Sequence, residues 1–263
     1  MNFIQAIILA IIEGITEFLP ISSTGHMIIA SSFMKIASDD FTKMFTVGIQ
    51  FGAILSVLVL YYKRFLSARA LYYKLLIAFI PAAVLGKLLN DYIDALLENP
   101  VTVAISLLLG GFVLLYIDKI FKDESSHHQH EPSNKSAFII GLFQCIAMIP
   151  GVSRSAATII GGMQQNLSRK AAAEFSFFLA VPTMLAATGY KMLKYIKGGG
   201  AFGSNELMLF GIGNLVAFVV ALIAIKTFIT FLQKNGFKVF GYYRIIVGIV
   251  LLVIHFFVMP LTI

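Results

Sequence analysis

Residues 13–26 read EGITEFLPISSTGH and place two glutamates, two serines and a histidine inside an otherwise apolar region. Pro20 divides the stretch, and a proline inside a helix removes a backbone hydrogen bond and breaks the ladder. Broken backbone at membrane depth is tolerated only where protein or water surrounds it. We therefore expect residues 3–34 to form a re-entrant helical hairpin, which enters a membrane and returns without crossing it.

The rest of the chain has the composition of an integral membrane protein. Of its 263 residues, 59% are hydrophobic and 13% are charged, and the mean hydropathy is +0.88. The apolar runs are continuous and do not alternate with period two, which favours spanning helices over a β-barrel. Six runs are long enough to span: 44–62, 72–89, 101–118, 174–190, 206–225 and 243–259.

A second broken segment, residues 136–163 around Pro150, suggests an internal repeat. A shift of 130 positions lays Pro20 on Pro150 and Ser23 on Ser153, and the spans then overlay in the same order. Each half is one hairpin followed by three spans, so the second half must start from the opposite face of the membrane. We predict an all-α polytopic fold with an inverted-topology repeat: half one 1–121, a polar loop 122–135 and half two 136–263.

Loop charges give the orientation and exclude other classes of protein. The 63–74 connection carries four basic residues and the 90–100 connection three acidic ones, so 63–74 is expected to be cytoplasmic. The lysines at 191, 194 and 197 then fall outside, against this rule. The net charge of +7 reflects basic loops, and no nucleic-acid partner is expected. The single cysteine, Cys145, excludes an internal disulfide.

The polar loop contains three histidines, His127, His128 and His130, in the segment KDESSHHQHEPSNK. Three histidines in one short tract could bind a metal. A solvated loop between the repeats is the favoured interpretation of this composition.

Glu13 and Glu17 are four residues apart and share one helix face. Two carboxylates in a low-dielectric setting persist if one is protonated or if a cation lies between them. An oxygen-only pair suits a hard divalent ion, Mg²⁺ or Ca²⁺. The alternative is an interfacial helix whose glutamates contact solvent.

Beyond Pro20, hydroxyl side chains and a glycine precede an apolar run and predict a helix N-terminus, which is a ready anion site. Ser23, Thr24 and His26 lie there. His26 could act as a general base or as a nucleophile.

The second hairpin carries PGVSRSAAT at 150–158. Ser153 and Ser155 can cap the following helix, and the planar guanidinium of Arg154 matches phosphate oxygens bidentately. Alternatively, Arg154 pairs with Glu13 or Glu17 as a buried ion pair, which need not exclude function. If both hairpin tips meet, they form a clamp for a phosphorylated lipid, either a phosphate or a diphosphate.

Both motifs resemble those of the bacterial undecaprenyl-diphosphate phosphatases, the bacitracin-resistance or BacA-type family. PGVSRSAAT is similar to that family's PGxSRSxxT motif, and residues 45–65 and 171–187 also look like family stretches. The resemblance covers essentially the whole chain. By motif, the implied functional residues are Glu13, Glu17, Ser23, Thr24 and His26 with Ser153, Arg154, Ser155 and Thr158, and Gln50 is a weaker candidate.

The resemblance implies a multi-pass hydrolase of the bacterial plasma membrane that removes the terminal phosphate from undecaprenyl diphosphate. It implies recycling of the lipid carrier for peptidoglycan and other cell-wall polymers, bacitracin resistance, a divalent cation, and a site open to the extracytoplasmic side. Ser23, His26 and a metal-bound water remain alternative attacking groups. A flippase of the lipid carrier is the alternative function, because inverted repeats with broken helices are typical of transporters. A homodimer is left open.

Overall fold

The computed structural model describes residues 1–263 except 68, 98, 122–130, 201, 259–260 and 262–263. Within these residues the secondary structure is helical and contains no strand. The three loop histidines, His127, His128 and His130, lie outside the described residues, so their metal site stays a prediction.

Among the described residues, six helical stretches are long and apolar enough to cross a membrane, and they match the six predicted spans. The first stretch, Asp40–Leu60, consists of two helices with a break between them. The others are single helices, of which the last ends in a π-helical turn. In order they are α3 (Asp40–Gly48) with α4 (Gln50–Leu60), α6 (Arg69–Leu88), α8 (Pro100–Ile120), α11 (Arg169–Lys197), α12 (Ser204–Asn235), and α13 (Lys238–Val253) with η1 (Ile254–Val258). The polytopic all-α fold is therefore confirmed.

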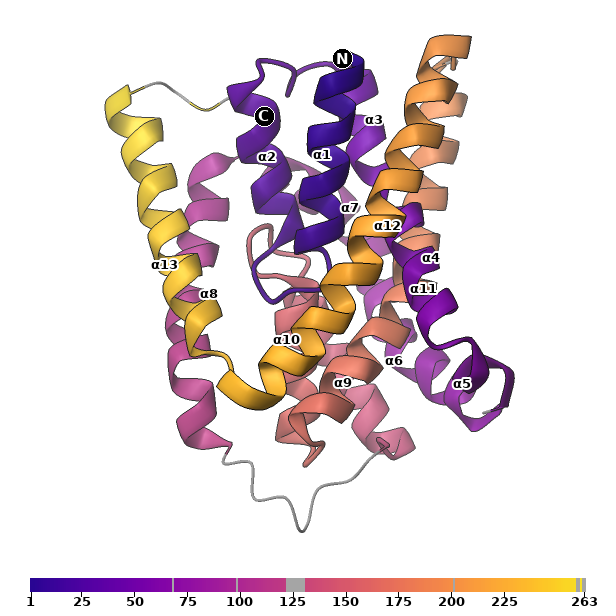
Figure 1. Cartoon of the computed structure of the whole chain (residues 1–263), viewed down its shortest axis with the longest axis vertical. Helices are drawn as coiled ribbons and strands as arrows, with labels where there is room; N and C mark the ends of the chain where they lie inside the picture. The colour runs from indigo at the N-terminus through magenta and orange to yellow at the C-terminus, as the bar shows by residue number, and fades with distance from the viewer. Residues whose placement is uncertain (68, 98, 122–130, 201, 259–260, 262–263) are drawn as a thin grey trace.

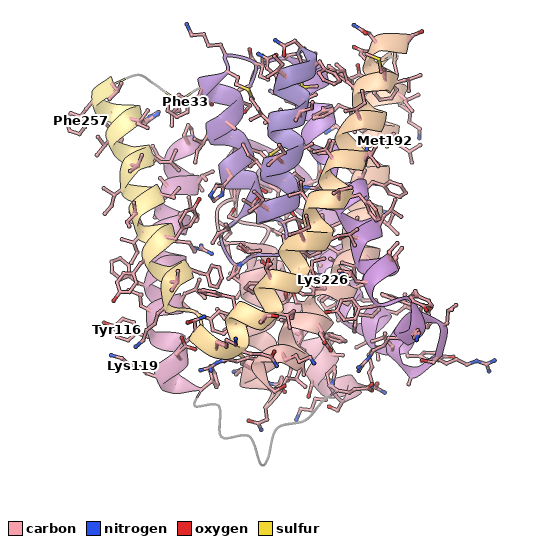
Figure 2. The ribbon with its side chains drawn as sticks, viewed as in Figure 1. Phe33, Tyr116, Lys119, Met192, Lys226 and Phe257 are labelled. Atoms are coloured by element: carbon pink, nitrogen blue, oxygen red, sulfur yellow. The ribbon has the colours of Figure 1, made fainter. Side chains whose placement is uncertain are left out.

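Apolar side chains cover the outside of this bundle, as a lipid-facing surface requires. Leu109, Leu215 and Phe257 are 63%, 63% and 83% exposed. Figure 2 shows Tyr116 and Lys119 near one end of the bundle and Met192 toward the opposite end. The C-terminal ends of α8 and α11 thus lie toward opposite ends of the bundle, as the predicted order of spans requires. The short helices α5 (Tyr62–Ser67) and α7 (Asn90–Leu97) connect the spans of the first half.

The two broken segments form helical hairpins, α1 (Phe3–Thr16) with α2 (Ser23–Phe33) and α9 (Asn134–Ile146) with α10 (Arg154–Gln164). They enter the bundle from opposite ends (Figure 1), which is the arrangement that an inverted repeat predicts. Helix α1 packs on α12 of the second half, and α9 packs on α6 of the first half. The first helix of each hairpin is therefore held by the other half of the chain, while α10 packs on α11 of its own half.

Glycines allow these exchanged helices to approach closely. A Cβ on Gly14 of α1 would lie 2.8 Å from the carbonyl oxygen of Ala217, and one on Gly141 of α9 would overlap the backbone of Ala78. Small residues at such contacts let helix backbones pack tightly inside a membrane. This close packing fixes how deep each hairpin lies.

Local geometry corrects the alignment of the two hairpins by one residue. Ser22 (φ 69°) and Ser153 (φ 77°) are the N-caps of α2 and α10, and Lys35 (φ 56°) and Asn166 (φ 59°) follow these helices. Both pairs are 131 positions apart, so the sequence shift of 130 pairs Ser153 with the wrong serine. Positive φ is rare outside glycine. Its recurrence at matching positions is therefore a more reliable guide to the alignment of the two hairpins than the sequence shift.

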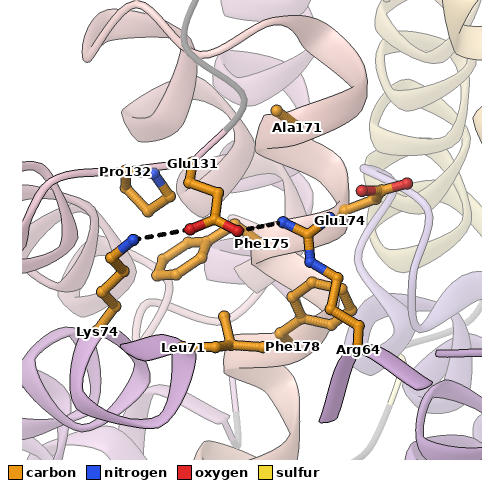
Figure 3. Close-up of a pocket in the computed structure, with 9 residues that line it drawn as sticks. All are labelled: Arg64, Leu71, Lys74, Glu131, Pro132, Ala171, Glu174, Phe175 and Phe178. Carbon is orange, nitrogen blue, oxygen red and sulfur yellow. Dashed lines mark hydrogen bonds and ion pairs between the residues drawn. The ribbon is translucent and has the colours of Figure 1, made fainter. Parts of the chain in front are cut away.

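The end of the inter-repeat connection is attached to the first half by Glu131. Its carboxylate accepts hydrogen bonds from Arg64 (2.8 Å) and Lys74 (2.9 Å), as Figure 3 shows. Leu71, Phe175 and Phe178 pack beneath this ion-pair cluster. The hydrogen bond from Lys74 lowers the pKa of Glu131 from its ordinary 4.5, and the charges of Lys74 and Arg64 lower it further. Partial burial of the carboxylate acts in the opposite direction.

Replacement of Glu131 by Gln should lower thermal stability slightly at neutral pH and not at acid pH. A carboxylate whose pKa is lowered by folding stabilises the protein above the unfolded-state pKa, and this contribution is lost as pH falls through the folded-state pKa. The carboxylate is 46% exposed, so the effect will lie within the range of about 0.2–1 kcal/mol for exposed pairs. Melting in detergent across a pH series measures it, and Lys74→Met is the matched variant. A difference that persists at acid pH would contradict this prediction.

Candidate active site

The tips of the two hairpins meet at a cavity of about 260 Å³. Spans α4 and α11 and the short helix α7 complete its wall. Its lining includes six of the residues proposed from the sequence: Glu17, Ser23, Thr24, Gln50, Ser153 and Arg154. Polar residues of both hairpins therefore line one cavity, as we expected if the two tips meet.

Glu17 connects the two hairpins. Its Oε1 lies 2.8 Å from Nη2 of Arg154, and its Oε2 accepts a 2.6 Å hydrogen bond from Oγ of Ser23. The carboxylate is 7% exposed and the guanidinium side chain 14%. The predicted ion pair of Arg154 is therefore present with Glu17, and the interpretation in which the glutamates contact solvent is wrong.

Arg154 is oriented by several further contacts. Its Nη1 donates to the carbonyl oxygen of Ser176 at 3.0 Å, and the guanidinium lies 6.0 Å from the ring centre of Phe18. Its buried Nε has no hydrogen-bond partner among the described residues. The guanidinium is thus fixed in place and retains an unused donor.

Both helices that follow the hairpin turns begin at the cavity. Ser22 caps α2 by accepting from the backbone N–H of Gly25 (3.4 Å), and Ser153 caps α10 by accepting from that of Ala156 (3.3 Å). A helix N-terminus carries roughly half a positive charge and exposes N–H donors. Two such termini beside Arg154 make the cavity a favourable place for an anion with several oxygens.

Glu13 lies behind this cavity, one helical turn from Glu17. It is fully buried, and neither of its carboxylate oxygens has a hydrogen-bond partner within the described chain. Orphaned carboxylate oxygens fit a role as ligands for a hard cation. No cluster of three or more His, Cys, Asp or Glu side chains surrounds a metal position in the described part, so substrate or water oxygens would have to complete the coordination.

His26 points away from the cavity lining. Its Nδ1 lies 2.8 Å from the carbonyl oxygen of Ser22, and its Nε2 lies 2.6 Å from the hydroxyl of Tyr243, whose ring stacks on the imidazole. A carbonyl can only accept, so Nδ1 carries the proton and Nε2 accepts from the tyrosine. In this geometry His26 holds the Ser22 turn, and its role as an attacking group stays a prediction.

Ser155 and Thr158 are buried behind Arg154 and do not line the cavity. The hydroxyl of Ser155 donates to the carbonyl of Leu19 in the first hairpin at 2.7 Å. Thr158 shares a 2.7 Å hydrogen bond with Ser176. Both side chains brace the cavity wall, so direct substrate contact is not what their geometry favours.

Arg244 of α13 was not identified from the sequence and is fully buried. It donates only to carbonyl oxygens: Pro20 (3.2 Å), Gly151 (2.8 Å) and Val152 (2.9 Å) in the hairpin turns, and Ser106 (3.0 Å) and Leu107 (3.3 Å) in α8. Gly110 leaves room for it, because a Cβ there would overlap the guanidinium. A lone ionisable residue at the start of the last apolar run was the available signal.

Comparisons with known proteins place the whole chain among named relatives. The family model described as bacitracin resistance protein BacA matches residues 6–250. A Flavobacterium johnsoniae protein named undecaprenyl-diphosphatase is 66% identical over 267 residues, which cover 100% of both chains. A protein of the same name from Porphyromonas gingivalis is 54% identical, and the match covers 97% of each chain. Another, from Aquifex aeolicus, is 46% identical, and the match covers 94% of this chain and 96% of the relative.

Replacement of Arg244 by Met should destabilise the protein strongly, because the three carbonyls of the hairpin turns, those of Pro20, Gly151 and Val152, lose their donor. Unsatisfied buried groups cost about 1–3 kcal/mol each, and a total above about 3 kcal/mol corresponds to a melting temperature lower by roughly 6–12 °C. Thermal unfolding in detergent measures this. Arg69→Met, at an exposed position of α6, is the control. Equal stability of the two variants would show that Arg244 does not hold the turns.

Proposed function

The chain belongs to the family of the bacitracin resistance protein BacA, and from this membership we propose that it is an undecaprenyl-diphosphate phosphatase of the membrane. It hydrolyses undecaprenyl diphosphate to undecaprenyl phosphate and inorganic phosphate, which recycles the lipid carrier for peptidoglycan and other cell-wall polymers and confers bacitracin resistance. The observation that carries the proposal is the cluster of Glu17, Ser23 and Arg154, contributed by both hairpins and lining one cavity.

The diphosphate headgroup suits this cavity. Small-molecule pockets usually enclose about 300–1,000 Å³, and about 260 Å³ is enough for a headgroup, while the prenyl tail extends between the apolar spans. The guanidinium of Arg154 and the N-termini of α2 and α10 supply positive charge and donors for the phosphate oxygens. The lining residues Met184 and Ala187 offer apolar contact where the tail begins.

Ser23 is the best-placed attacking group. Its hydroxyl already donates to Glu17, which can take the proton as Oγ attacks the terminal phosphorus. The bond from that phosphorus to the bridging oxygen breaks, and undecaprenyl phosphate leaves with the electron pair. The proton on Glu17 passes to the departing undecaprenyl phosphate, which leaves Glu17 ionised again. Water then attacks the phosphorus of the phosphoserine, Glu17 accepts the water proton and returns it to Oγ of Ser23 as the Oγ–P bond breaks, and inorganic phosphate leaves. Arg154 neutralises the charge that develops on the phosphate oxygens, which is the main term in phosphoryl transfer.

A divalent cation, Mg²⁺ or Ca²⁺, would be held by Glu13 and Glu17. The support is the orphaned, fully buried carboxylate of Glu13 beside Glu17 and the oxygen-only character of the pair. When bound, such an ion neutralises phosphate charge.

The protein is expected in the plasma membrane of a bacterium, with the site open to the extracytoplasmic side. Its relatives are bacterial, and six spans make it a multi-pass membrane protein. The basic connection 63–74 and the loop that ends at Glu131 share one end of the bundle, which the loop charges assign to the cytoplasm.

Phosphate release in detergent tests the function. The purified protein should release phosphate from farnesyl diphosphate or undecaprenyl diphosphate with Mg²⁺ or Ca²⁺, and chelator should abolish release. Glu17→Ala and Arg154→Ala should each lower kcat by about 10²–10³, the usual cost of a lost electrostatic contact. Glu131→Gln and Arg69→Met are matched controls remote from the cavity. A folded wild-type protein that releases no phosphate would favour the flippase instead.

Trapping a phosphoenzyme tests the attacking group. Rapid quenching should yield an acid-stable phosphoserine at Ser23, absent in Ser23→Ala and still formed, more slowly, in His26→Gln. The reason is geometric, because Ser23 lines the cavity and the nitrogens of His26 are both engaged elsewhere. An acid-labile adduct on His26 would reverse the assignment, and the absence of any adduct would favour water.

A further inference from the structure

The first span is broken beside the cavity. Helix α3 ends at Gly48 and α4 begins at Gln50, with Ile49 between them at φ −73° and ψ −14°. No side chain at the start of α4 caps this helix. A helix end inside a membrane leaves N–H and C=O groups without intrahelical partners, and such groups must be satisfied by neighbouring elements.

Two other spans supply the missing partners. The hydroxyl of Thr188 on α11 donates to the carbonyl oxygen of Val47 at 3.3 Å, at the end of α3. Oδ1 of Asn214 on α12 accepts from the backbone N–H of Gly52 at 2.6 Å, at the start of α4. Asn214 thus caps α4 from another helix.

The asparagine is itself oriented. Its Nδ2 donates to the carbonyl oxygen of Phe210 in its own helix at 2.9 Å, which directs Oδ1 toward α4. A Cβ at position 52 would overlap the backbone of Asn214, so only glycine permits this approach. The cap is specific to this pair of positions.

The break directs Gln50 to the cavity. Gln50 is the first residue of α4 and lines the cavity with Glu17 and Arg154. Ala187, next to Thr188, lines it as well. The cap on Gly52 therefore lies two residues from a polar side chain that lines the cavity, and the N-cap residue Ile49 makes no side-chain cap hydrogen bond of its own.

We propose that Asn214 is a positioning residue for substrate binding: by capping α4 across the helix boundary, it holds the amide of Gln50 where that amide donates to the diphosphate headgroup. The proposal rests on the proposed function, since it names a further determinant of the same site. Asn214 touches no substrate and acts through Gln50 alone.

Steady-state phosphate release from farnesyl diphosphate tests the proposal with Gln50→Ala, Asn214→Ala and the double variant. Loss of a cap and loss of the Gln50 contact should each raise KM about tenfold, with kcat within about twofold because binding before chemistry is affected. The double variant should show no further rise in KM, since both changes remove the same contact. Asn214→Asp keeps the acceptor oxygen and should restore most of the affinity.

Asn235→Ala is the matched control, because Asn235, the last residue of α12, makes the same hydrogen bond to the carbonyl four residues earlier. KM of Asn214→Ala within twofold of wild type would overturn the proposal. So would KM effects that multiply in the double variant, or failure of Asn214→Asp to restore binding. A lower melting temperature with unchanged KM would assign Asn214 a structural role only.

Lack of turnover in the wild type would refute the proposed function and not the role of Asn214. Equilibrium binding of farnesyl diphosphate to wild type and to Asn214→Ala then decides that role.

Discussion

The site depends on the buried guanidinium of Arg244. It joins the carbonyls of both hairpin turns to those of α8, so elements from the two halves of the chain meet at one side chain. Carbonyls that point toward Arg244 leave the helix N-termini beyond the turns directed at the cavity. The charge is compensated by five acceptors instead of a carboxylate, which keeps Glu17 available for the cavity.

This arrangement also supports unusual backbone in the turns. Ser22 and Ser153 are non-glycine residues at positive φ, and such conformations cost about 1–3 kcal/mol each unless the surroundings over-determine them. Arg244 holds the adjacent carbonyls, His26 holds that of Ser22, and the hydroxyls of both serines cap the following helices. The motif residues outside the cavity therefore have a physical reason to be there: they keep the turns in shape.

Hydropathy and proline placement predicted the elements that depend on neighbouring residues in the sequence. The six spans follow from length and composition, and the hairpins from Pro20 and Pro150. The ion pair of Arg154, which joins positions 137 apart, was an alternative drawn from the cost of lone charges in a membrane, with Glu13 or Glu17 as the partner. The trans caps of α3 and α4 and the carbonyl cage of Arg244 join residues more than 90 positions apart. No local pattern carries such contacts. Gln50 and Asn214 could not be linked before α4 and α12 were seen side by side.

A buried ion pair and a phosphate site are compatible at the same residues. Before substrate binds, Glu17 and Arg154 neutralise each other, and Ser23 occupies the second carboxylate oxygen. In the proposed reaction an incoming diphosphate presents anionic oxygens that the planar guanidinium can bind in the same bidentate way as a carboxylate, so Arg154 keeps an anionic partner. The carboxylate released from Arg154 remains bonded to the hydroxyl of Ser23. Substrate binding would thus leave Glu17 paired with the hydroxyl that is proposed to attack.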